Sequence, residues 1–244
     1  MSNTETKPDY QGLSAVFINT TLTPSPKDSH TDMLMDVVRD IMRGAGVSVS
    51  SYRSVDHDIA PGVYPDMTEH GFKSDAWPAI GKAVKDADIL VLGTPIWLGE
   101  VSSECRKVIE RLYAHSGEMN EKGQYVFYGK TAGAIITGNE DGVKHCAMGM
   151  LYSLAHIGYM IPPQPDAGWI GEIGPGPSYG DEKEDGSRVG FDSEFTARNA
   201  TFLAWNLMHT ANMLKQAGGL PAYGNSRRAW DDGERFDHPN PEYR

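Results

Sequence analysis

The sequence predicts an α/β fold built on a doubly wound, five-stranded parallel sheet with helices on both faces. Short apolar runs alternate with longer amphipathic patterns along the chain, as in repeated strand–helix–strand units. The apolar runs are continuous, which is typical of parallel strands because helices cover both sides of the sheet. Polar segments rich in threonine and glycine follow the first, third and fourth runs, where an open parallel sheet binds its ligand.

The first half of the chain contains three of the predicted strands. In order, we expect a strand at residues 13–19, a helix that Ser29 caps and Gly44 ends, a strand at 47–55, a long loop at 56–77, a helix at 78–85 and a strand at 88–94. The first helix has an apolar face formed at three- and four-residue spacing by Met33, Leu34, Val37, Val38 and Ile41. Prolines and glycines interrupt the long loop, so we expect no strand there.

The second half continues the alternation as far as a polar tail. We expect a helix at residues 102–115, a strand at 131–137, a helix at 143–156, a short strand at 159–161 and a final helix at 193–216. The chain therefore divides into a polar N-terminal arm (residues 1–12), one ligand-binding domain (13–217) and a C-terminal tail (218–244). Within the domain we expect an insert loop (residues 56–77) and a Gly- and Pro-rich flap (residues 167–190).

Composition narrows the classes of partner. The chain has 244 residues, 22 Lys and Arg against 33 Asp and Glu, and a formal net charge of −11. Nucleic acids and anionic membranes need a basic face, so neither is expected as a partner. The N-terminus has no apolar signal region and no stretch is apolar enough to span a membrane, so we expect a cytoplasmic protein. Cys105 and Cys146 lie in helical patterns and are expected to be reduced core thiols.

Motifs decide between the two common strand orders of such sheets. A dinucleotide-binding sheet needs Gly-x-Gly-x-x-Gly directly after its first strand, whereas residues 20–25 read TTLTPS. The phosphate loop of nucleotide triphosphatases is also absent. These absences favour the flavodoxin-like order 2-1-3-4-5, which brings together the loops after strands one, three and four.

The first of these loops has the composition of a phosphate site. Hydroxyl side chains accumulate between residues 20 and 31, and the loop ends at the start of a helix. Hydroxyls and free backbone N–H groups at a helix N-terminus bind anions such as a phosphate dianion. The alternative is a polar loop that Ser29 merely caps, and Asp28 and Asp32 favour that alternative because they already satisfy the helix dipole.

The other two loops suit a planar ligand. Residues 94–99 read TPIWLG, which places Trp97 and apolar neighbours at an edge that a flat ring would cover. The alternative is that Trp97 packs against another subunit. Residues 137–142 read TGNEDG, whose glycines let the backbone approach a ligand closely. The alternative there is an ordinary strand-to-helix turn.

Together, residues 19–23, 29–31, 94–102 and 137–142 resemble the NADPH-dependent FMN reductase branch of the flavodoxin-like superfamily. The similarity covers about residues 12–162. It implies bound FMN, with its phosphate in the first loop and its isoalloxazine ring between the second and third. The residues that the resemblance assigns to FMN are Thr21, Thr23, Ser29, His30 and Thr31 for the phosphate, Pro95, Ile96, Trp97, Leu98 and Gly99 along the ring, and Thr137, Gly138, Asn139, Asp141 and Gly142 at its polar edge. His30 stands where the family often has asparagine.

The resemblance implies an oxidoreductase in which NAD(P)H reduces the flavin and a quinone, free flavin or other small acceptor receives the electrons. No catalytic side chain is expected, because the isoalloxazine carries this chemistry. One alternative is an electron carrier or FMN-binding module without NAD(P)H activity of its own. Another is an interaction protein that has lost the flavin. The sequence does not separate NADH from NADPH, since it shows no arginine site for a ribose phosphate.

Other patterns carry less weight. Residues 176–180 match Gly-x-Ser-x-Gly, but no strand precedes them and no helix follows, so a hydrolase is not expected. We expect this segment to form a flap over the flavin or a subunit contact instead. The adjacent Asp56, His57 and Asp58 cannot all face one ion, and two cysteines cannot ligate an iron–sulfur cluster, so no metal is expected. The Trp97 loop and a tail containing Trp230 predict a homodimer or homotetramer.

Overall fold

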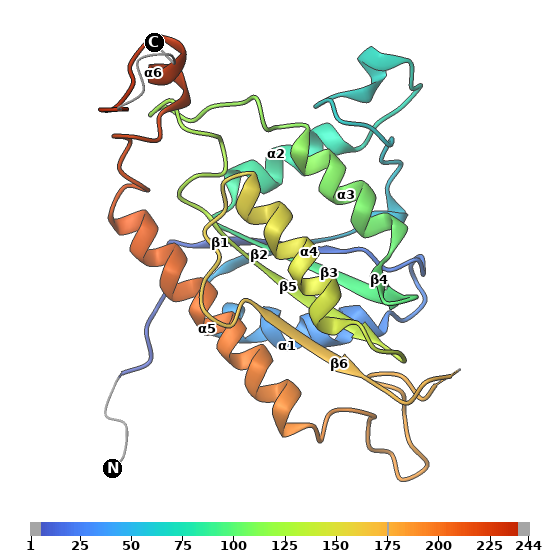
Figure 1. Cartoon of the computed structure of the whole chain (residues 1–244). Helices are drawn as coiled ribbons and strands as arrows, with labels where there is room; N and C mark the ends of the chain where they lie inside the picture. The colour runs from blue at the N-terminus through green and yellow to red at the C-terminus, as the bar shows by residue number, and fades with distance from the viewer. Residues whose placement is uncertain (1–5, 175, 239–244) are drawn as a thin grey trace.

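A parallel sheet in the order β2-β1-β3-β5-β6 forms the centre of the molecule (Figure 1). The structure is a computed structural model that describes residues 6–174 and 176–238. The parallel strands are β1 (Ser14–Asn19), β2 (Ser48–Arg53), β3 (Ile89–Trp97), β5 (Thr131–Gly138) and β6 (Asp166–Ile170). The two-residue β4 (Glu100–Val101) pairs antiparallel with the end of β3. Counted over the parallel strands alone, this is the predicted order 2-1-3-4-5, and the flavodoxin-like fold is confirmed.

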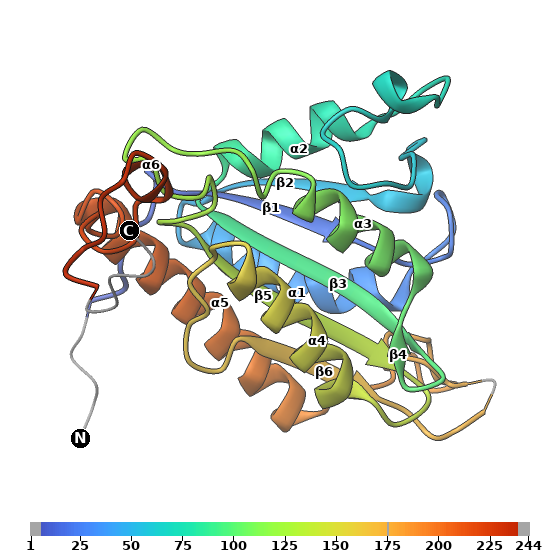
Figure 2. The ribbon, with the colours of Figure 1, turned by 45° about the horizontal axis from the view of Figure 1, so that its top comes forward.

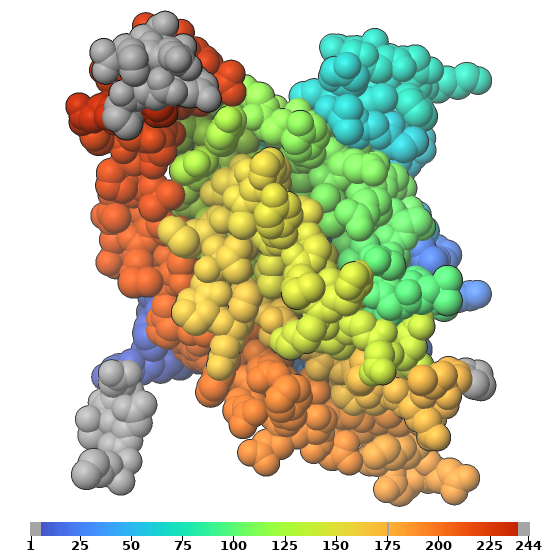
Figure 3. All heavy atoms as spheres, in the orientation of Figure 1, coloured from blue at the N-terminus to red at the C-terminus, as the bar shows by residue number. Residues whose placement is uncertain are grey.

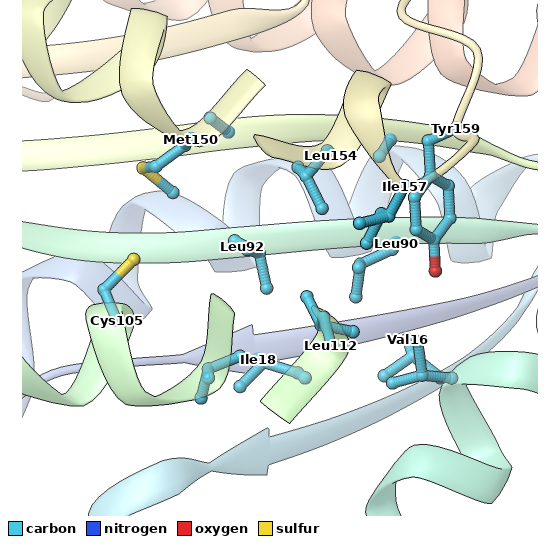
Figure 4. Packing of buried hydrophobic residues seen from close by; sticks show 14 of the residues in the cluster. Val16, Ile18, Leu90, Leu92, Cys105, Leu112, Met150, Leu154, Ile157 and Tyr159 are labelled. Atoms are coloured by element: carbon cyan, nitrogen blue, oxygen red, sulfur yellow. The ribbon is translucent and has the colours of Figure 1, made fainter. Parts of the chain in front are cut away.

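Helices cover both faces of the sheet, as Figure 2 shows. One face carries α1 (His30–Gly44) and α5 (Glu194–Gln216), and the other carries α2 (Trp77–Asp86), α3 (Ser103–Tyr113) and α4 (Val143–His156). Alternate strand residues enter two separate cores, because side chains along a strand point to opposite faces. Figure 4 shows the core beneath α3 and α4, where Ile18, Leu90 and Leu92 meet Leu112 and Met150. Both cysteines are buried and free, as predicted.

The fifth strand is not where the sequence predicts it. Residues 159–161 contribute a single bridge, between Met160 and Thr131, and the strand that completes the sheet is β6. Tyr159 is buried against Phe127, with ring centroids 4.8 Å apart, so its apolar surroundings reflect core packing. Asp166 and Gly168 interrupt the apolar pattern of β6. The flap predicted at residues 167–190 therefore begins inside the sheet.

The insert loop at residues 56–77 projects from the body of the molecule (Figures 1 and 3). It contains a short 3₁₀ helix, η2 (Met67–His70), and a second one, η1 (Ser54–Asp56), precedes it. Its anchor is Asp75, whose carboxylate lies 2.6 Å from the buried guanidinium of Arg111 on α3. The loop is thus fixed at its base by an ion pair.

The tail folds back on the chain itself through α6 (Arg227–Asp231). The buried side chain of Gln124 donates hydrogen bonds to the carbonyl of Pro221 (3.0 Å) and to the side chain of Asn225 (2.7 Å). Ser226 caps α6 and also donates to the carbonyl of Lys122 at 3.1 Å. The start of the tail is therefore held against residues 122–124 by hydrogen bonds within the same chain.

A buried histidine links α2 to the end of α3. The indole N–H of Trp77 donates to Nε2 of His115 at 3.0 Å, so Nδ1 carries the proton and donates to Glu118 at 2.6 Å. Burial lowers the pKa of His115, while Glu118 opposes that shift and Lys85 and Arg111 add to it. A protonated ring would point an Nε2–H at the indole N–H, so this packing requires the neutral form.

This histidine is expected to make stability depend on pH. Because its pKa is lower in the folded protein, its contribution is present above the unfolded value of about 6.5 and is lost as pH falls through the folded value. The midpoint of urea unfolding should therefore fall more steeply on acidification for the wild type than for His115→Gln. His145→Gln, on an exposed pair with Glu100, is the matched control and should keep the wild-type slope. Equal slopes for all three proteins would contradict the prediction.

Candidate functional site

A cavity of about 500 Å³ opens at the carboxyl ends of β1, β3 and β5, within the size range of small-molecule and cofactor pockets. Most of the residues predicted from the sequence line it, and these are Thr21, Thr23, Ser29, His30, Thr31, Pro95, Ile96, Trp97, Thr137, Gly138 and Asn139. Leu98, Gly99, Asp141 and Gly142 lie outside the lining. Strand order alone brings these loops together, as an open parallel sheet requires at its switch point.

The first loop is held tightly from below. The side chain of Asn19 donates to Ser29 Oγ (3.1 Å) and accepts from the backbone N–H of Thr21 (3.0 Å). The hydroxyl of Ser102 donates to the carbonyl of Thr20 at 2.6 Å. Ser29 in turn caps α1 by accepting from the N–H of Asp32. The loop thus presents its hydroxyls and the first turn of α1 to the cavity in a fixed arrangement.

Asp32 does not cancel the positive end of α1, as its sequence position suggests it would. Its carboxylate lies 2.7 Å from Arg39 and 3.1 Å from Arg53. The two guanidinium groups neutralise this carboxylate, which is mostly buried between them. The first turn of the helix, with N–H groups that lack intrahelical partners, stays suited to an anion.

The second and third loops support each other at the ring end of the cavity. Trp97 is 55% exposed, and Leu98, at φ 54°, is 93% exposed. The backbone N–H of Leu98 donates to Glu140 at 2.7 Å. Gly99 and Gly142 approach so closely that a Cβ on Gly142 would lie 2.9 Å from the carbonyl oxygen of Gly99. These glycines therefore serve the packing of one loop on the other.

Asn139 and His30, which both line the cavity, also bind the flap through hydrogen bonds. The amide of Asn139 donates to the carbonyl of Pro177 (2.9 Å) and accepts from the hydroxyl of Ser178 (2.8 Å). Nδ1 of His30 donates to the carbonyl of Tyr179 at 2.9 Å. Ser178 is thus engaged in a structural hydrogen bond, and the Gly-x-Ser-x-Gly match has no nucleophile geometry.

Several residues that line the cavity were not predicted from the sequence. They are Leu22, Asp28, Glu140, Trp169, Ile173, Gly174, Ser178 and Tyr179. Leu22, Asp28 and Glu140 lie within the predicted loops and could have been included on position alone. The others belong to β6 and the flap, whose place over the cavity depends on a strand that the sequence did not reveal. Trp169 and Tyr179 pack together with ring centroids 5.7 Å apart.

The residues present fit FMN. Hydroxyl side chains and the first turn of α1 suit its phosphate, and Pro95, Ile96 and Trp97 provide an apolar wall for a planar ring. Thr31 and Thr137, whose hydroxyls are 2.7 Å apart, join the phosphate end to the third loop. The absence of a Cβ at Gly138 leaves room for Ile96, since a Cβ there would lie 2.9 Å from it.

Comparison with known proteins finds relatives that match most of this chain. The chain is 59% identical over 213 residues to the divalent metal cation transporter MntH of Mycobacterium bovis; the match covers 87% of this chain but only 31% of that protein. It is 33% identical over 210 residues to the 8-demethyl-8-aminoriboflavin-5'-phosphate synthase of Streptomyces davaonensis, covering 84% of this chain and 79% of the synthase. The crystal structure of RosB with the bound intermediate 8-demethyl-8-formylriboflavin-5'-phosphate superposes with a TM-score of 0.78 and 30% identity, over 95% of each chain.

In the described part of the chain, none of the helices combines the length and apolar character needed to cross a membrane.

The model of the family described as NADPH-dependent FMN reductase matches residues 20–170, which run from the loop directly after β1 to the end of β6 and include the three loops. This match covers more than half of the chain and includes every residue predicted to contact the flavin. The chain therefore belongs to the NADPH-dependent FMN reductase family.

Proposed function

We propose that this protein is an FMN-dependent NAD(P)H oxidoreductase that passes electrons to a quinone, free flavin or other small acceptor. The family match and the flavin-enzyme relatives support a flavin-dependent oxidoreductase that uses FMN and NADPH. The observation that carries the finer proposal is the cavity formed by three loops at the switch point of the sheet, with one polar, hydroxyl-rich end and one apolar end. Bound FMN would supply the redox chemistry, and NAD(P)H would supply the electrons.

The chain's own part is binding and orientation. We propose that Thr21, Thr23, Ser29, His30 and Thr31 hold the phosphate. Pro95, Ile96 and Trp97 would lie along the ring, with Thr137, Gly138 and Asn139 near its polar edge. Leu98, Gly99, Asp141 and Gly142 would act from behind by fixing the two loops. The proposed electron transfer requires no side chain that acts as an acid or base. The cytoplasmic location stays a prediction.

A visible absorption spectrum before and after anaerobic NADPH tests the proposal. We expect a two-band spectrum of oxidised flavin that bleaches on addition of NADPH. A yellow protein that neither NADPH nor NADH bleaches would favour the electron carrier without its own NAD(P)H activity. A colourless protein that FMN does not reconstitute would overturn the flavin assignment.

A second candidate function is chemical modification of a flavin phosphate that serves as substrate. The relative from Streptomyces davaonensis is named for such a product, and RosB was crystallised with a riboflavin-5'-phosphate derivative. The same cavity would then bind the flavin reversibly. Incubation of the protein with FMN and an amino donor, with dioxygen as the oxidant of the 8-methyl group, followed by mass spectrometry of the flavin, separates the two. Unchanged FMN, with a protein that turns over NADPH, would support the oxidoreductase alone.

We also propose that the chain forms a homodimer through the exposed face of α3 and α4, which Figure 3 shows in green and yellow. Tyr113, Met148 and Tyr152 are 50%, 66% and 71% exposed there. Hollows of about 270 and 380 Å³ lie between the two helices. Exposed apolar surface of this kind marks interaction sites in soluble proteins.

The substitution Tyr152→Glu is expected to convert this oligomer to monomer, because it places a charge in an apolar contact. Gel filtration with light scattering at micromolar concentration measures the change. Phe195→Glu, on the outer face of α5 and 62% exposed, is the matched control and should leave the mass unchanged. A monomeric wild type would contradict both this interface and the predicted homodimer or homotetramer.

A further inference from the structure

The charge of the cavity is unbalanced. Among the described residues that line it, Asp28 and Glu140 carry carboxylates and none is lysine or arginine. A flavin phosphate would bring nearly two further negative charges at neutral pH. The N-terminal end of α1 offsets about half an elementary charge. In the described lining, His30 is the only side chain that can become positive.

His30 is the first residue of α1, and its ring stands between the cavity and the flap. Nδ1 donates to the carbonyl oxygen of Tyr179 at 2.9 Å and lies 3.6 Å from a carboxylate oxygen of Asp181. With Nδ1 carrying a proton, the neutral ring has only a lone pair at Nε2. Nε2 can donate to a phosphate oxygen only when the ring is protonated.

The groups that face Nδ1 of this ring come from the flap. Nδ1 faces the carbonyl of Tyr179 and a carboxylate oxygen of Asp181, and Asp28 and Glu140 line other parts of the same cavity. Burial raises the pKa of Tyr179, so its hydroxyl stays neutral. The described contacts of His30 include no cation that would oppose protonation.

We propose that His30 takes up a proton from solvent when a flavin phosphate binds, and that the imidazolium joins the phosphate to the flap. Its Nε2–H donates to the phosphate, and its Nδ1–H holds Tyr179. The inference rests on the proposed function, because it requires a flavin phosphate in the cavity. It adds that affinity for FMN depends on pH and that the bound phosphate strengthens the existing contact between His30 and the flap.

Binding of FMN and of riboflavin to the flavin-free full chain tests the proposal. Fluorescence titrations between about pH 7 and 8.5 avoid the second ionisation of the phosphate itself, near pH 6. The dissociation constant of FMN should rise with pH, by up to about tenfold per unit for one proton taken up. That of riboflavin, which lacks the phosphate, should not change. Calorimetry in two buffers with different heats of ionisation should show proton uptake with FMN only.

Three variants separate the charge from the contact. His30→Asn should bind FMN about tenfold more weakly than wild type at pH 7, with no pH dependence and unchanged affinity for riboflavin. His30→Lys supplies a fixed charge and should bind FMN at pH 8.5 more tightly than wild type does. Asn139→Ala removes the other anchor of the flap but keeps the imidazole, so it should retain proton uptake.

Trypsin reports the state of the flap, which contains Lys183 and Arg188. In the wild type, FMN should protect these sites from cleavage more than riboflavin does. In His30→Asn, the two flavins should give the same weak protection. Tight FMN binding with no pH dependence and no proton uptake would overturn the inference and leave the proposed function intact. Failure to bind either flavin at any pH would remove the proposed function itself.

Discussion

Replacement of Asp75 by alanine is expected to lower the free energy of unfolding by about 3–5 kcal/mol, because it leaves the buried Arg111 without its counter-ion. Both side chains have no solvent exposure, and the interacting atoms are 2.6 Å apart. The Asp75 carboxylate also accepts hydrogen bonds from the backbone N–H groups of Ala60, Met67 and Trp77 at 3.0–3.2 Å. One side chain thus both balances a buried charge and organises the insert loop.

Apart from Asp75, the buried Arg111 guanidinium contacts one backbone carbonyl and the indole ring of Trp77, whose centroid lies 5.8 Å from Cζ. Its Nε and Nη1 atoms are buried without a hydrogen-bond partner among the described residues, and Nη2 donates to the carbonyl of Pro65 at 3.2 Å. Burial lowers the pKa of Arg111, and the nearby carboxylate of Asp75 acts against that shift. A charge held in this way makes a one-sided substitution costly.

Urea unfolding followed by circular dichroism measures the effect. Asp86→Ala is the matched control, since its pair with Lys82 is exposed and such pairs contribute about 0.5 kcal/mol or less. The double variant Asp75→Leu/Arg111→Met should recover part of the loss, because no buried charge remains. A loss below about 1 kcal/mol for Asp75→Ala would show that water reaches Arg111 and that the pair is not truly buried.

The ion pair also shows where sequence analysis stops. Sequence pattern predicted α1, α2, α3, α4 and α5, since an apolar face is a local feature, as is the serine cap of α1. Neither feature predicts that Asp75, in the insert loop, pairs with Arg111 on α3. β6 was missed for a related reason: its single buried alanine, Ala167, leaves no apolar run to recognise.

Some features of the candidate site could be predicted from the sequence, and others could not. The three loops could be predicted because strand order alone brings the ends of β1, β3 and β5 together. The contacts of the flap could not, because Asn139 and His30 bind it through backbone carbonyls that any sequence would supply. The neutralisation of Asp32 by Arg39 and Arg53 likewise depends on side chains from α1 and β2.

Substitution of Gly142 by alanine is expected to weaken FMN binding by about tenfold to a hundredfold, corresponding to about 1.4–2.8 kcal/mol. Gly142 has φ 141°, which L-residues rarely adopt, and such backbone strain costs about 1–3 kcal/mol. The new Cβ would also lie 2.9 Å from the carbonyl oxygen and 3.0 Å from the Cα of Gly99. Backbone atoms cannot turn aside as a side chain can.

The two loops must therefore separate, and the wall formed by Pro95, Ile96 and Trp97 moves with Gly99. Because this wall lies at the ring end, affinity for riboflavin should fall together with affinity for FMN. That distinguishes the substitution from His30→Asn, which should affect FMN alone. Fluorescence titration of both flavins, with urea unfolding of the same variant, measures binding and stability separately.

Gly149→Ala is the matched control for the Gly142 substitution. Gly149 lies within α4, and a Cβ there would meet nothing within 4 Å. Alanine in a helix interior is more stable than glycine by about 0.5–1 kcal/mol, so this variant should be slightly more stable with unchanged flavin affinity. If Gly142→Ala lost stability but kept wild-type affinity for both flavins, the close approach of the loops would serve folding alone. The ring wall would then have to be held by other contacts, of which the hydrogen bond from the Leu98 N–H to Glu140 is the first to test.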